Sequence, residues 1–433
     1  MNGPCGSAIL ARRAVSIDRE SPGYTATAPR VGFVLARYPV LSETFILREL
    51  YEMHRLGIQV SIFAFGSNPD NLAHPMVQAL DAPVVILPEE RRRAHIARAF
   101  LFWGTHAPRT LTRALRGAGG PEAFHASLGA LYLAREAIPH APEHFHAHYL
   151  SSPAAAARTM AILHGTTFSA TAHAHDIYLS DPDELGRRIT QAAWVRTISR
   201  FNRRLLRGMA LGISPRRVQV IRVGIDLSSY AYRPPDPQPA VCRIASVGRL
   251  VAIKGFDVLL KAVALLSARP WFLSIVGAGP LEHSLKGLAT ELGISHRVRF
   301  EGPLVQEAVR DLLAKTDLFV LAARRDDAGN MDGLPSVLTE ALATGIPTVS
   351  TTVSGIPELV GAGAGLLVPP GDPQAMAAAM ARLMDEPELR LRLSARGRRR
   401  VERAWSVQAR CRDLSRRLGE LSGHGLAPSP PRP

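Results

Sequence analysis

The residues of this sequence best suited to chemistry begin with an acidic pair, Asp332 and Glu340, separated by seven residues in the segment NMDGLPSVLTEALATG. The segment follows the apolar run DLFVLAA and a polar loop, so Asp332 lies after a predicted strand and just ahead of a predicted helix. Gly333 permits a backbone turn that a side chain would obstruct, and Pro335 suits a first helical turn. The free amide groups and the dipole of such a helix start favour an anion such as phosphate.

Several companions strengthen this interpretation. Glu340 lies four residues after Ser336 on one face of the predicted helix, so it can reach the same ligand, although acids near helix starts also serve as caps. Arg249 and Lys254, in SVGRLVAIKGFDVLLKA, lie between a predicted strand and helix at the same sheet edge and could clamp a diphosphate. Solvated loop charges are the alternative. Gly277 in IVGAGP ends a further strand but lacks the full dinucleotide-binding spacing.

The first half of the chain contains a row of histidines. His144, His146 and His148 alternate in HFHAHYL like one face of a strand, which raises the hypothesis of a metal site. No carboxylate or cysteine accompanies them, so we expect histidines of the core or of an acceptor site instead.

The loop RYPVLSETF follows the first predicted strand, so Ser42, Glu43 and Thr44 are expected to face a cleft. The alternative is a helix cap by Ser42, with the other two residues in the first turn. Capping does not exclude contact with an acceptor.

The elements that must position these residues alternate regularly. The run RVGFVLA, the helical stretch TFILRELYEMHRLG and the run IQVSIFAF form one strand–helix–strand unit, and Gly57 stands where a left-handed helix end is expected. After a proline-rich linker, strands and helices alternate up to PTVST, which indicates a parallel sheet covered on both faces. The predicted fold class is α/β, with two parallel-sheet domains and a ligand cleft between them.

The predicted domain boundaries follow from these changes in composition along the chain. They are a disordered leader at 1–29, a first domain at 30–230, a linker at 231–240, a second domain at 241–404, a C-terminal helix at 405–421 and a disordered tail at 422–433.

Composition narrows the class of protein. The 433 residues are 46% hydrophobic and 21% charged, which suits a globular chain with two cores. The formal net charge of +15 favours anionic partners without naming one. Three widely spaced cysteines favour a reducing compartment, and neither a cleaved signal nor a run of ~18 apolar residues is present. We therefore expect a cytoplasmic protein.

An ordered set of motifs points to a family. VGRLVAIKGFDVLLKA, IVGAGP, FEGPLVQEAV, DGLPSVLTEALATGIPTVST, GIPELV and GLLVPPGD follow one another. Together they strongly resemble the nucleotide-binding half of retaining glycosyltransferases of the glycogen-synthase-like GT-B type, glycosyltransferase family 4. YPVLSETFILREL and HFHAHYL…TAHAHDIY look like the subgroup that builds bacterial exopolysaccharides, colanic acid among them. The resemblance implies an N-terminal acceptor-binding domain, a C-terminal nucleotide-sugar-binding domain, and a C-terminal helix that returns to the first domain.

The resemblance also implies residue roles. Arg249 and Lys254 would hold the diphosphate, Glu340 the ribose, and Asp332 the donor sugar. Asp332 stands where the family usually has glutamate. Its side chain is shorter by one methylene group, so the resemblance does not fix the identity of the sugar. The implied catalytic residues are His173, Arg249, Lys254 and Asp332. The implied donor-binding residues are Arg249, Lys254, Gly277, Val305, Asp332, Gly333, Leu334, Pro335, Ser336 and Glu340. The implied acceptor-side residues are Ser42, Glu43, Thr44, His148 and His175, with Asp176 beside them.

The implied reaction moves a sugar, with retention, from a nucleoside-diphosphate sugar to a glycan or lipid-linked acceptor. No cofactor and no metal are expected, because cations and helix amides would neutralise the diphosphate, and the motifs offer no enzymatic nucleophile. Nucleic acid is not an expected partner. Peripheral attachment of the basic segment RRRAHIAR to the anionic inner face of the cell membrane is expected. The alternatives are a nucleotide-sugar 2-epimerase, which would yield an epimer, and a sugar-binding protein without turnover.

Overall fold

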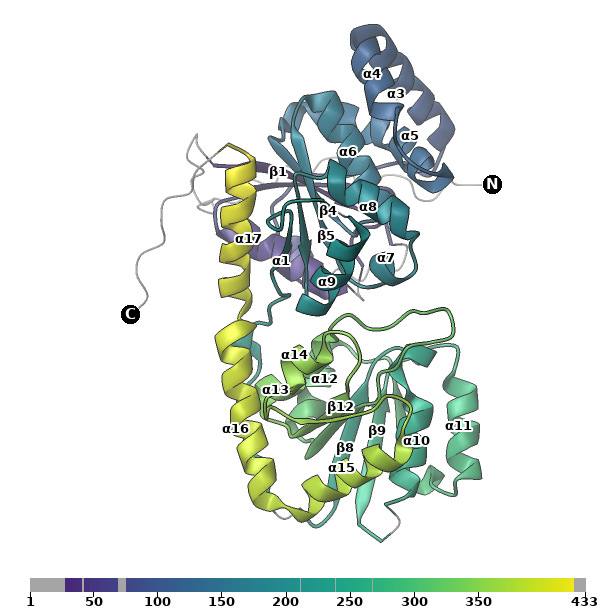
Figure 1. Ribbon diagram of the computed structural model, residues 1–433, viewed down its shortest axis with the longest axis vertical. Helices are drawn as coiled ribbons and strands as arrows, with labels where there is room; N and C mark the ends of the chain where they lie inside the picture. Colours follow the sequence, from purple (N-terminus) through teal and green to yellow (C-terminus); the bar gives the residue numbers. More distant parts are fainter. Residues whose placement is uncertain are drawn as a thin grey trace, which may run out of the picture.

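The computed structural model describes residues 28–40, 43–68, 75–210, 212–237, 239–266 and 268–423, which fold into two α/β domains placed one above the other in Figure 1. Ser42, nearly all of the predicted leader and most of the predicted tail lie outside these residues. Each domain is built on one sheet, and every strand pair within the two sheets is parallel. The predicted fold class is confirmed.

The first domain has a seven-stranded sheet of order β3-β2-β1-β4-β5-β6-β7. Its strands are β1 (Arg30–Leu35), β2 (Gln59–Ala64), β3 (Val84–Ile86), β4 (His144–His148), β5 (Thr167–Ala172), β6 (Trp194–Thr197) and β7 (Val218–Val220). Its helices are α1 (Thr44–Arg55), α2 (Pro75–Ala79), α3 (Arg92–His106), α4 (Pro108–Leu115), α5 (Pro121–Glu136), α6 (Ser152–His164), α7 (His175–Tyr178), α8 (Pro182–Gln191) and α9 (Arg200–Met209). Helices on both faces bury the central strands almost completely, β4 throughout.

The second domain has a six-stranded sheet of order β10-β9-β8-β11-β12-β13. Its strands are β8 (Cys242–Val247), β9 (Trp271–Val276), β10 (Val298–Gly302), β11 (Leu318–Leu321), β12 (Thr348–Thr351) and β13 (Leu366–Val368). Its helices are α10 (Phe256–Ala264), α11 (Glu282–Glu291), α12 (Gln306–Ala314), α13 (Ser336–Thr344), α14 (Ile356–Val360), α15 (Pro373–Asp385) and α16 (Pro387–Ala404).

The strand order reverses in the middle of each sheet, between β1 and β4 and between β8 and β11. Loops that leave the carboxyl ends of these neighbours diverge and open a crevice, which is where ligands of such sheets bind. The first predicted helix, α1, begins at Thr44, and Gly57 beyond its end has a φ of 86°, the left-handed conformation predicted for it.

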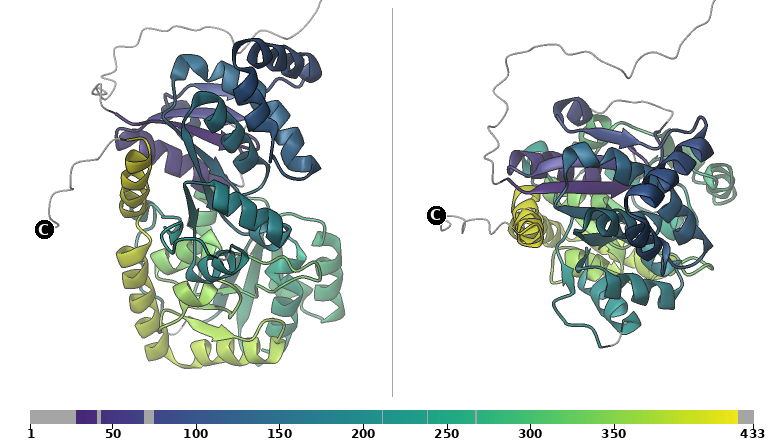
Figure 2. Two further views of the ribbon diagram at one scale, coloured as in Figure 1. Left: turned by 45° about the horizontal axis from the view of Figure 1, so that its top comes forward. Right: turned by 90° about the horizontal axis from the view of Figure 1, so that it is seen from above.

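The last helix, α17 (Val407–Leu421), returns to the first domain, as the resemblance implied. Figures 1 and 2 show α16 and α17 in yellow along one side of both domains. Residues spaced along one face of α17 are buried in the same core cluster as Leu50 and Met53 of α1: Val407, Cys411, Leu414 and Leu418. This packing attaches the last helix, α17, to the first helix, α1.

The chain crosses between the domains earlier than the predicted linker at 231–240. Ile225 and Tyr230, which fall within the predicted first domain, pack into a core cluster of the second domain. The backbone of Ile225 also bridges to the junction between α16 and α17, where its amide donates to the carbonyl of Trp405 at 2.7 Å. The linker was predicted from its proline content. In the structure the second core begins earlier, where these two side chains are buried.

Candidate active site

A cavity of about 320 Å³ lies between the domains. Its lining from the first domain and from the segment that crosses to the second domain comes from α1 and the loops after β4, β5, β6 and β7: Phe45, Arg48, Tyr149, His173, Ala174, His175, Ile198, Val223, Gly224 and Ile225. Its lining from the second domain comes from the loops after β8 and β11 and from α13: Lys254, Asp332, Gly333, Leu334, Pro335, Ser336, Thr339 and Glu340. The structure therefore brings together nine of the predicted site residues from distant parts of the chain.

Lys254 and Asp332 form an ion pair in this cavity. The Lys254 ammonium donates to both carboxylate oxygens of Asp332 at 2.8 Å, and each side chain is 15% exposed. Since an ammonium group has three donors and no fixed plane, it can exchange one carboxylate for another anion. The pair places a cation where a phosphate group could compete for it.

Helix α13 begins at the cavity wall. Pro335 is its N-cap, with φ −61° and ψ 123°, so the helix starts at Ser336, one residue later than the predicted first turn. The amide groups of a first turn have no acceptor within the helix. Because Pro335 and Ser336 line the cavity, the positive end of α13 opens on it.

Glu340 lies one turn deeper in the same helix. Burial raises the pKa of its carboxyl group, while the positive charges of Arg48 and Arg310 and a hydrogen bond with Tyr230 lower it. Arg48 belongs to α1 of the first domain and lines the cavity, so a cation from the opposite domain stabilises this carboxylate. Sequence reasoning missed Arg48, because its helix is otherwise anchored in the core by Ile46 and Leu47 and nothing in the local pattern separates it from a surface arginine.

The two domains meet closely beside the acidic pair. A Cβ atom at Gly333 would lie 2.8 Å from the carbonyl oxygen of His173 and 3.2 Å from the Cβ of Ala174, so only glycine allows this approach. The Tyr178 hydroxyl donates to Asn202 at 2.6 Å and contacts Ser354 of the second domain at 2.7 Å. These contacts fix the distance between the walls of the cavity.

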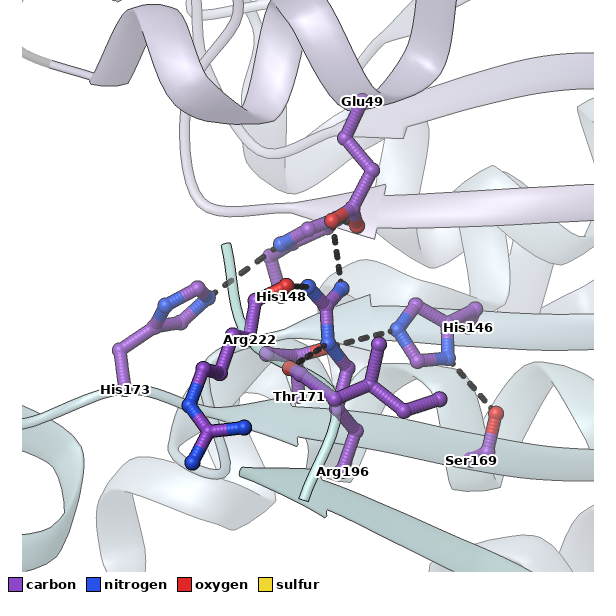
Figure 3. Close-up of polar contacts among 9 residues, drawn as sticks. Glu49, His146, His148, Ser169, Thr171, His173, Arg196 and Arg222 are labelled. Carbon is purple, nitrogen blue, oxygen red and sulfur yellow. Dashed lines mark hydrogen bonds and ion pairs between the residues drawn. The ribbon is translucent and has the colours of Figure 1, made fainter. Parts of the chain in front are cut away.

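His173 joins the cavity to a buried row of histidines (Figure 3). Its Nε2 lies 3.3 Å from Nδ1 of His148, whose own Nε2 lies 3.5 Å from a carboxylate oxygen of Glu49. Glu49 in turn binds the buried guanidinium of Arg196 at 2.5 Å. His148 does not line the cavity, so the predicted acceptor-side residue acts at most through His173.

The remaining histidines of the row are bound by hydroxyl groups of the neighbouring strand. The parallel register pairs β4 with β5 so that three histidines face three hydroxyl residues: His144 with Thr167, His146 with Ser169, and His148 with Thr171. His146, for example, contacts Ser169 at 2.7 Å and Thr171 at 2.8 Å. Burial lowers the pKa of His144 and His148 to about 3, and lowers that of His146 and His173 well below the ordinary value, so the row is neutral at pH 7.

The loops around His173 are held by one buried carboxylate. Asp176, buried, accepts from the backbone amides of Leu150 at 2.6 Å and of His173 and Ala174 at 3.0 Å each. These backbone bonds counteract the effect of burial, which raises the pKa of the carboxyl group. Asp176 therefore supports the loop, while the exposed His175 lines the cavity itself.

Glu43 and Thr44 start α1 but do not line the cavity. Glu43 is the N-cap position, and its carboxylate accepts from the hydroxyl of Tyr149 at 2.7 Å. Burial raises the pKa of Glu43, and this hydrogen bond opposes the effect. Tyr149, which sequence reasoning missed, lines the cavity and has a φ of 78°, a left-handed backbone conformation that few non-glycine residues adopt.

Three predicted donor residues lie outside the cavity lining. Arg249 is exposed in the loop after β8, and Val305 is 69% exposed ahead of α12. Gly277 has a φ of 133°, and a Cβ there would lie 2.0 Å from the carbonyl oxygen of Gly248, so this glycine packs two loops together. Their donor-binding role stays a prediction.

Within the described ranges, no group of three or more histidine, cysteine, aspartate or glutamate side chains is arranged to hold a metal ion. The histidine row is engaged by hydroxyl groups instead.

Comparison with known proteins decides the class. Residues 241–400 match the family model described as glycosyl transferases group 1. The amylovoran biosynthesis glycosyltransferase AmsK of Erwinia amylovora is 28% identical over 409 residues, covering 91% of this chain and 100% of that one. A provisionally named colanic acid biosynthesis glycosyltransferase, WcaL of Escherichia coli strain K12, is 29% identical over 417 residues, covering 90% and 100%. The chain is a glycosyltransferase.

Solved structures share the architecture of this glycosyltransferase. HepE of Anabaena, in complex with UDP and glucose, aligns with a TM-score of 0.69 at 17% identity, covering 90% of this chain and 100% of that one. A glycosyltransferase of Rickettsia africae aligns with a TM-score of 0.67 at 14% identity, covering 91% and 98%. The likeness shows the fold, and the predicted GT-B arrangement of two parallel-sheet domains is confirmed.

Proposed function

We propose that this glycosyltransferase moves a sugar, with retention of its anomeric configuration, from a nucleoside-diphosphate sugar to a glycan or lipid-linked acceptor in exopolysaccharide synthesis. The observation that carries the proposal is one cavity wall that combines the Lys254 ammonium, the start of α13 and the Glu340 carboxylate. The names of AmsK and WcaL support the exopolysaccharide setting, and the UDP complex of HepE supports a nucleotide donor.

The diphosphate binds beside the Lys254 ammonium and the amide end of α13. Phosphate oxygens accept from Lys254 and from the first-turn amides of α13, which releases Asp332 from its ion pair. The freed carboxylate accepts a hydrogen bond from a hydroxyl group of the donor sugar. Glu340, one turn deeper, accepts from the ribose hydroxyls.

The transfer breaks the bond between the anomeric carbon and the diphosphate oxygen and forms a bond from that carbon to the acceptor oxygen on the same face. The acceptor proton passes to the departing diphosphate, whose developing charge Lys254 and α13 stabilise. Neutral His173 has one ring nitrogen held by His148, which leaves the other to hydrogen-bond the sugar. The carboxylates that line the cavity in the described chain, Asp332 and Glu340, are both committed to binding, which supports a reaction without an enzymatic nucleophile.

We further propose that no metal ion takes part, because Lys254 and the helix start supply the charge that a divalent ion would otherwise supply. Arg249 reaches the diphosphate from its exposed loop when the donor binds.

The end of the first domain far from the cavity is the proposed membrane-facing surface. There α3, beside α4 and α5 in Figures 1 and 2, exposes Arg93 and Arg98 together with Phe100 (44%) and Leu101 (66%). Each arginine near an anionic surface adds about 1 kcal/mol of attraction. In the part of the chain that the structure describes, no helix combines the length and apolar character that a membrane crossing requires.

Sedimentation with anionic vesicles at low salt tests this surface. Arg93→Gln with Arg98→Gln should reduce the bound fraction, whereas Arg412→Gln with Arg416→Gln, exposed on α17, removes the same charge and should not. Equal binding to anionic and neutral vesicles would contradict the proposal.

The donor is identified by incubating the protein with a panel of nucleotide sugars and measuring thermal shift and slow hydrolysis. A glycosyltransferase releases free sugar and nucleoside diphosphate from its own donor even without an acceptor. An epimer with free nucleotide would favour the 2-epimerase, and binding without turnover would favour a sugar-binding protein.

A further inference from the structure

A second cavity, of about 510 Å³, lies on the other side of the chain crossing between the domains. Arg222 of the crossing segment lines it, whereas the next residues, Val223, Gly224 and Ile225, line the donor cavity. The backbone carbonyl of Arg222 accepts from Arg196 at 3.3 Å (Figure 3), while its side chain lines the second cavity. The crossing segment therefore separates two chambers with different linings.

The second cavity has an unusual excess of positive charge. Its ionisable lining consists of one carboxylate, Glu358, and six arginines, a difference of +5 (six minus one): Arg200, Arg222, Arg396, Arg399, Arg400 and Arg403. Only Arg222 has a carboxylate within ion-pair distance, Glu358 at 3.3 Å, among the residues that the structure describes. The other five guanidinium groups form no ion pair within the described ranges.

Two of these arginines are held in place by contacts with an aromatic ring and with the backbone. Arg222 and Arg400 lie over the ring of Trp405, at 4.8 and 5.9 Å from its centre. Arg400 donates to the backbone carbonyl of Glu358 at 2.6 Å. Burial lowers the pKa of both guanidinium groups; the carboxylate of Glu358 opposes this effect, and the nearby charge of Arg200 adds to it. One carboxylate therefore faces a larger number of cations in this cavity.

The exposed arginines of the rim come from both domains. Arg396, Arg399 and Arg403 are spaced three and four residues apart, so they project from one face of α16. Arg200 is the first residue of α9, at the positive end of that helix, where a further cation is unfavourable and an anion is favourable. The Glu358 carboxylate already accepts from the amide of Phe201 in this helix start at 2.9 Å.

We propose that this cavity binds a small anion with several phosphate groups, which bridges Arg200 of the first domain and the α16 arginines of the second. Guanidinium forks match phosphate oxygens in pairs, and a compact anion with three or four charges would relieve the repulsion within a volume of this size. Since the anion contacts both domains, it stabilises their present arrangement and thereby acts on the donor cavity from outside it.

Isothermal titration of the full chain with inorganic tripolyphosphate tests the proposal. To keep the donor cavity from contributing, the titration is repeated in Lys254→Ala, which should retain this binding. Arg399→Gln with Arg403→Gln should weaken it about tenfold or more, and Arg200→Gln should weaken it as well. The matched control is Arg392→Gln with Arg412→Gln, which removes equal charge from exposed positions outside the cavity and should leave the affinity unchanged.

Each other outcome overturns the proposal. Loss of binding in Lys254→Ala would place the anion in the donor cavity, and unchanged affinity in Arg399→Gln with Arg403→Gln would exclude the arginine rim. An unchanged affinity in Arg200→Gln would remove the bridge between domains. A further outcome is that tripolyphosphate does not bind, while anionic vesicles sediment the wild type but not Arg399→Gln with Arg403→Gln. In that case the arginines bind a membrane surface instead of a small anion.

Discussion

Replacing Glu340 by glutamine removes one negative charge from the wall of the donor cavity and keeps the size of the side chain. A hydrogen bond to a charged acceptor contributes about 1.5–3 kcal/mol, and a neutral one about 0.5–1.5 kcal/mol. The loss is therefore about 1 kcal/mol, or about a fivefold weaker Kd for the nucleoside diphosphate. Glu340→Ala removes the bond altogether and should weaken Kd about tenfold or more.

Titration calorimetry with UDP and GDP measures this effect. Glu291→Gln is the matched control, since Glu291 is exposed at the end of α11 and far from the cavity lining. The account is refuted if Glu340→Ala binds the preferred nucleoside diphosphate as tightly as the wild type does.

Stability separates this effect from damage to the fold. Burial raises the pKa of Glu340 above its ordinary 4.5 in the folded protein, whereas the unfolded chain keeps the ordinary value. As pH rises through this interval the unfolded state releases its proton first, so the wild type loses stability with rising pH and Glu340→Gln does not. We expect the Tm of the variant to equal or exceed that of the wild type at pH 7.

Three further predictions concern other groups. Asp332→Ala should keep nucleoside diphosphate binding, because Lys254 remains, but reduce transfer, while Asp332→Glu should retain transfer or change the preferred sugar; a folded Asp332→Ala enzyme with full transfer would limit the role of Asp332 to its ion pair with Lys254. Burial lowers the pKa of His144 and His148 from 6.5 to about 3, so the stability that they contribute above pH 6.5 should be lost as the pH falls towards 3. Over this pH range the Tm of His144→Gln should therefore fall less steeply than the Tm of the exposed control His125→Gln. Equal slopes of Tm against pH would contradict this prediction. EDTA should leave transfer unchanged. If EDTA abolished transfer and a divalent ion restored it, the histidine row would be the candidate metal site.

The fold could be predicted because strands and helices alternate with clear periods. Asp332 and Lys254 could be placed at one sheet edge because both follow parallel strands, and the structure joins them at 2.8 Å. Their direct pairing was not predicted, since it depends on the path of two loops. Proline content likewise could not reveal that Ile225 already packs in the second core.

The missed residues belong to the facing wall. Arg48 and Tyr149 line the cavity because the two domains face each other across it, and no local sequence pattern reports how far apart the domains lie. The histidine row had a usable signal: the hydroxyl residues of TFSATA alternate with the same period as the histidines of HFHAH, which predicts hydrogen bonds across neighbouring strands and argues against metal.

Glycosyl transfer with retention is tested most directly by proton NMR of the anomeric signal during turnover of the nucleotide sugar that the panel identifies. The account predicts that the sugar first appears, in the glycoside or on hydrolysis, with the anomeric configuration of the donor, and that Lys254→Ala slows its appearance. A first product of opposite configuration, or an epimer in place of a transferred sugar, would contradict it.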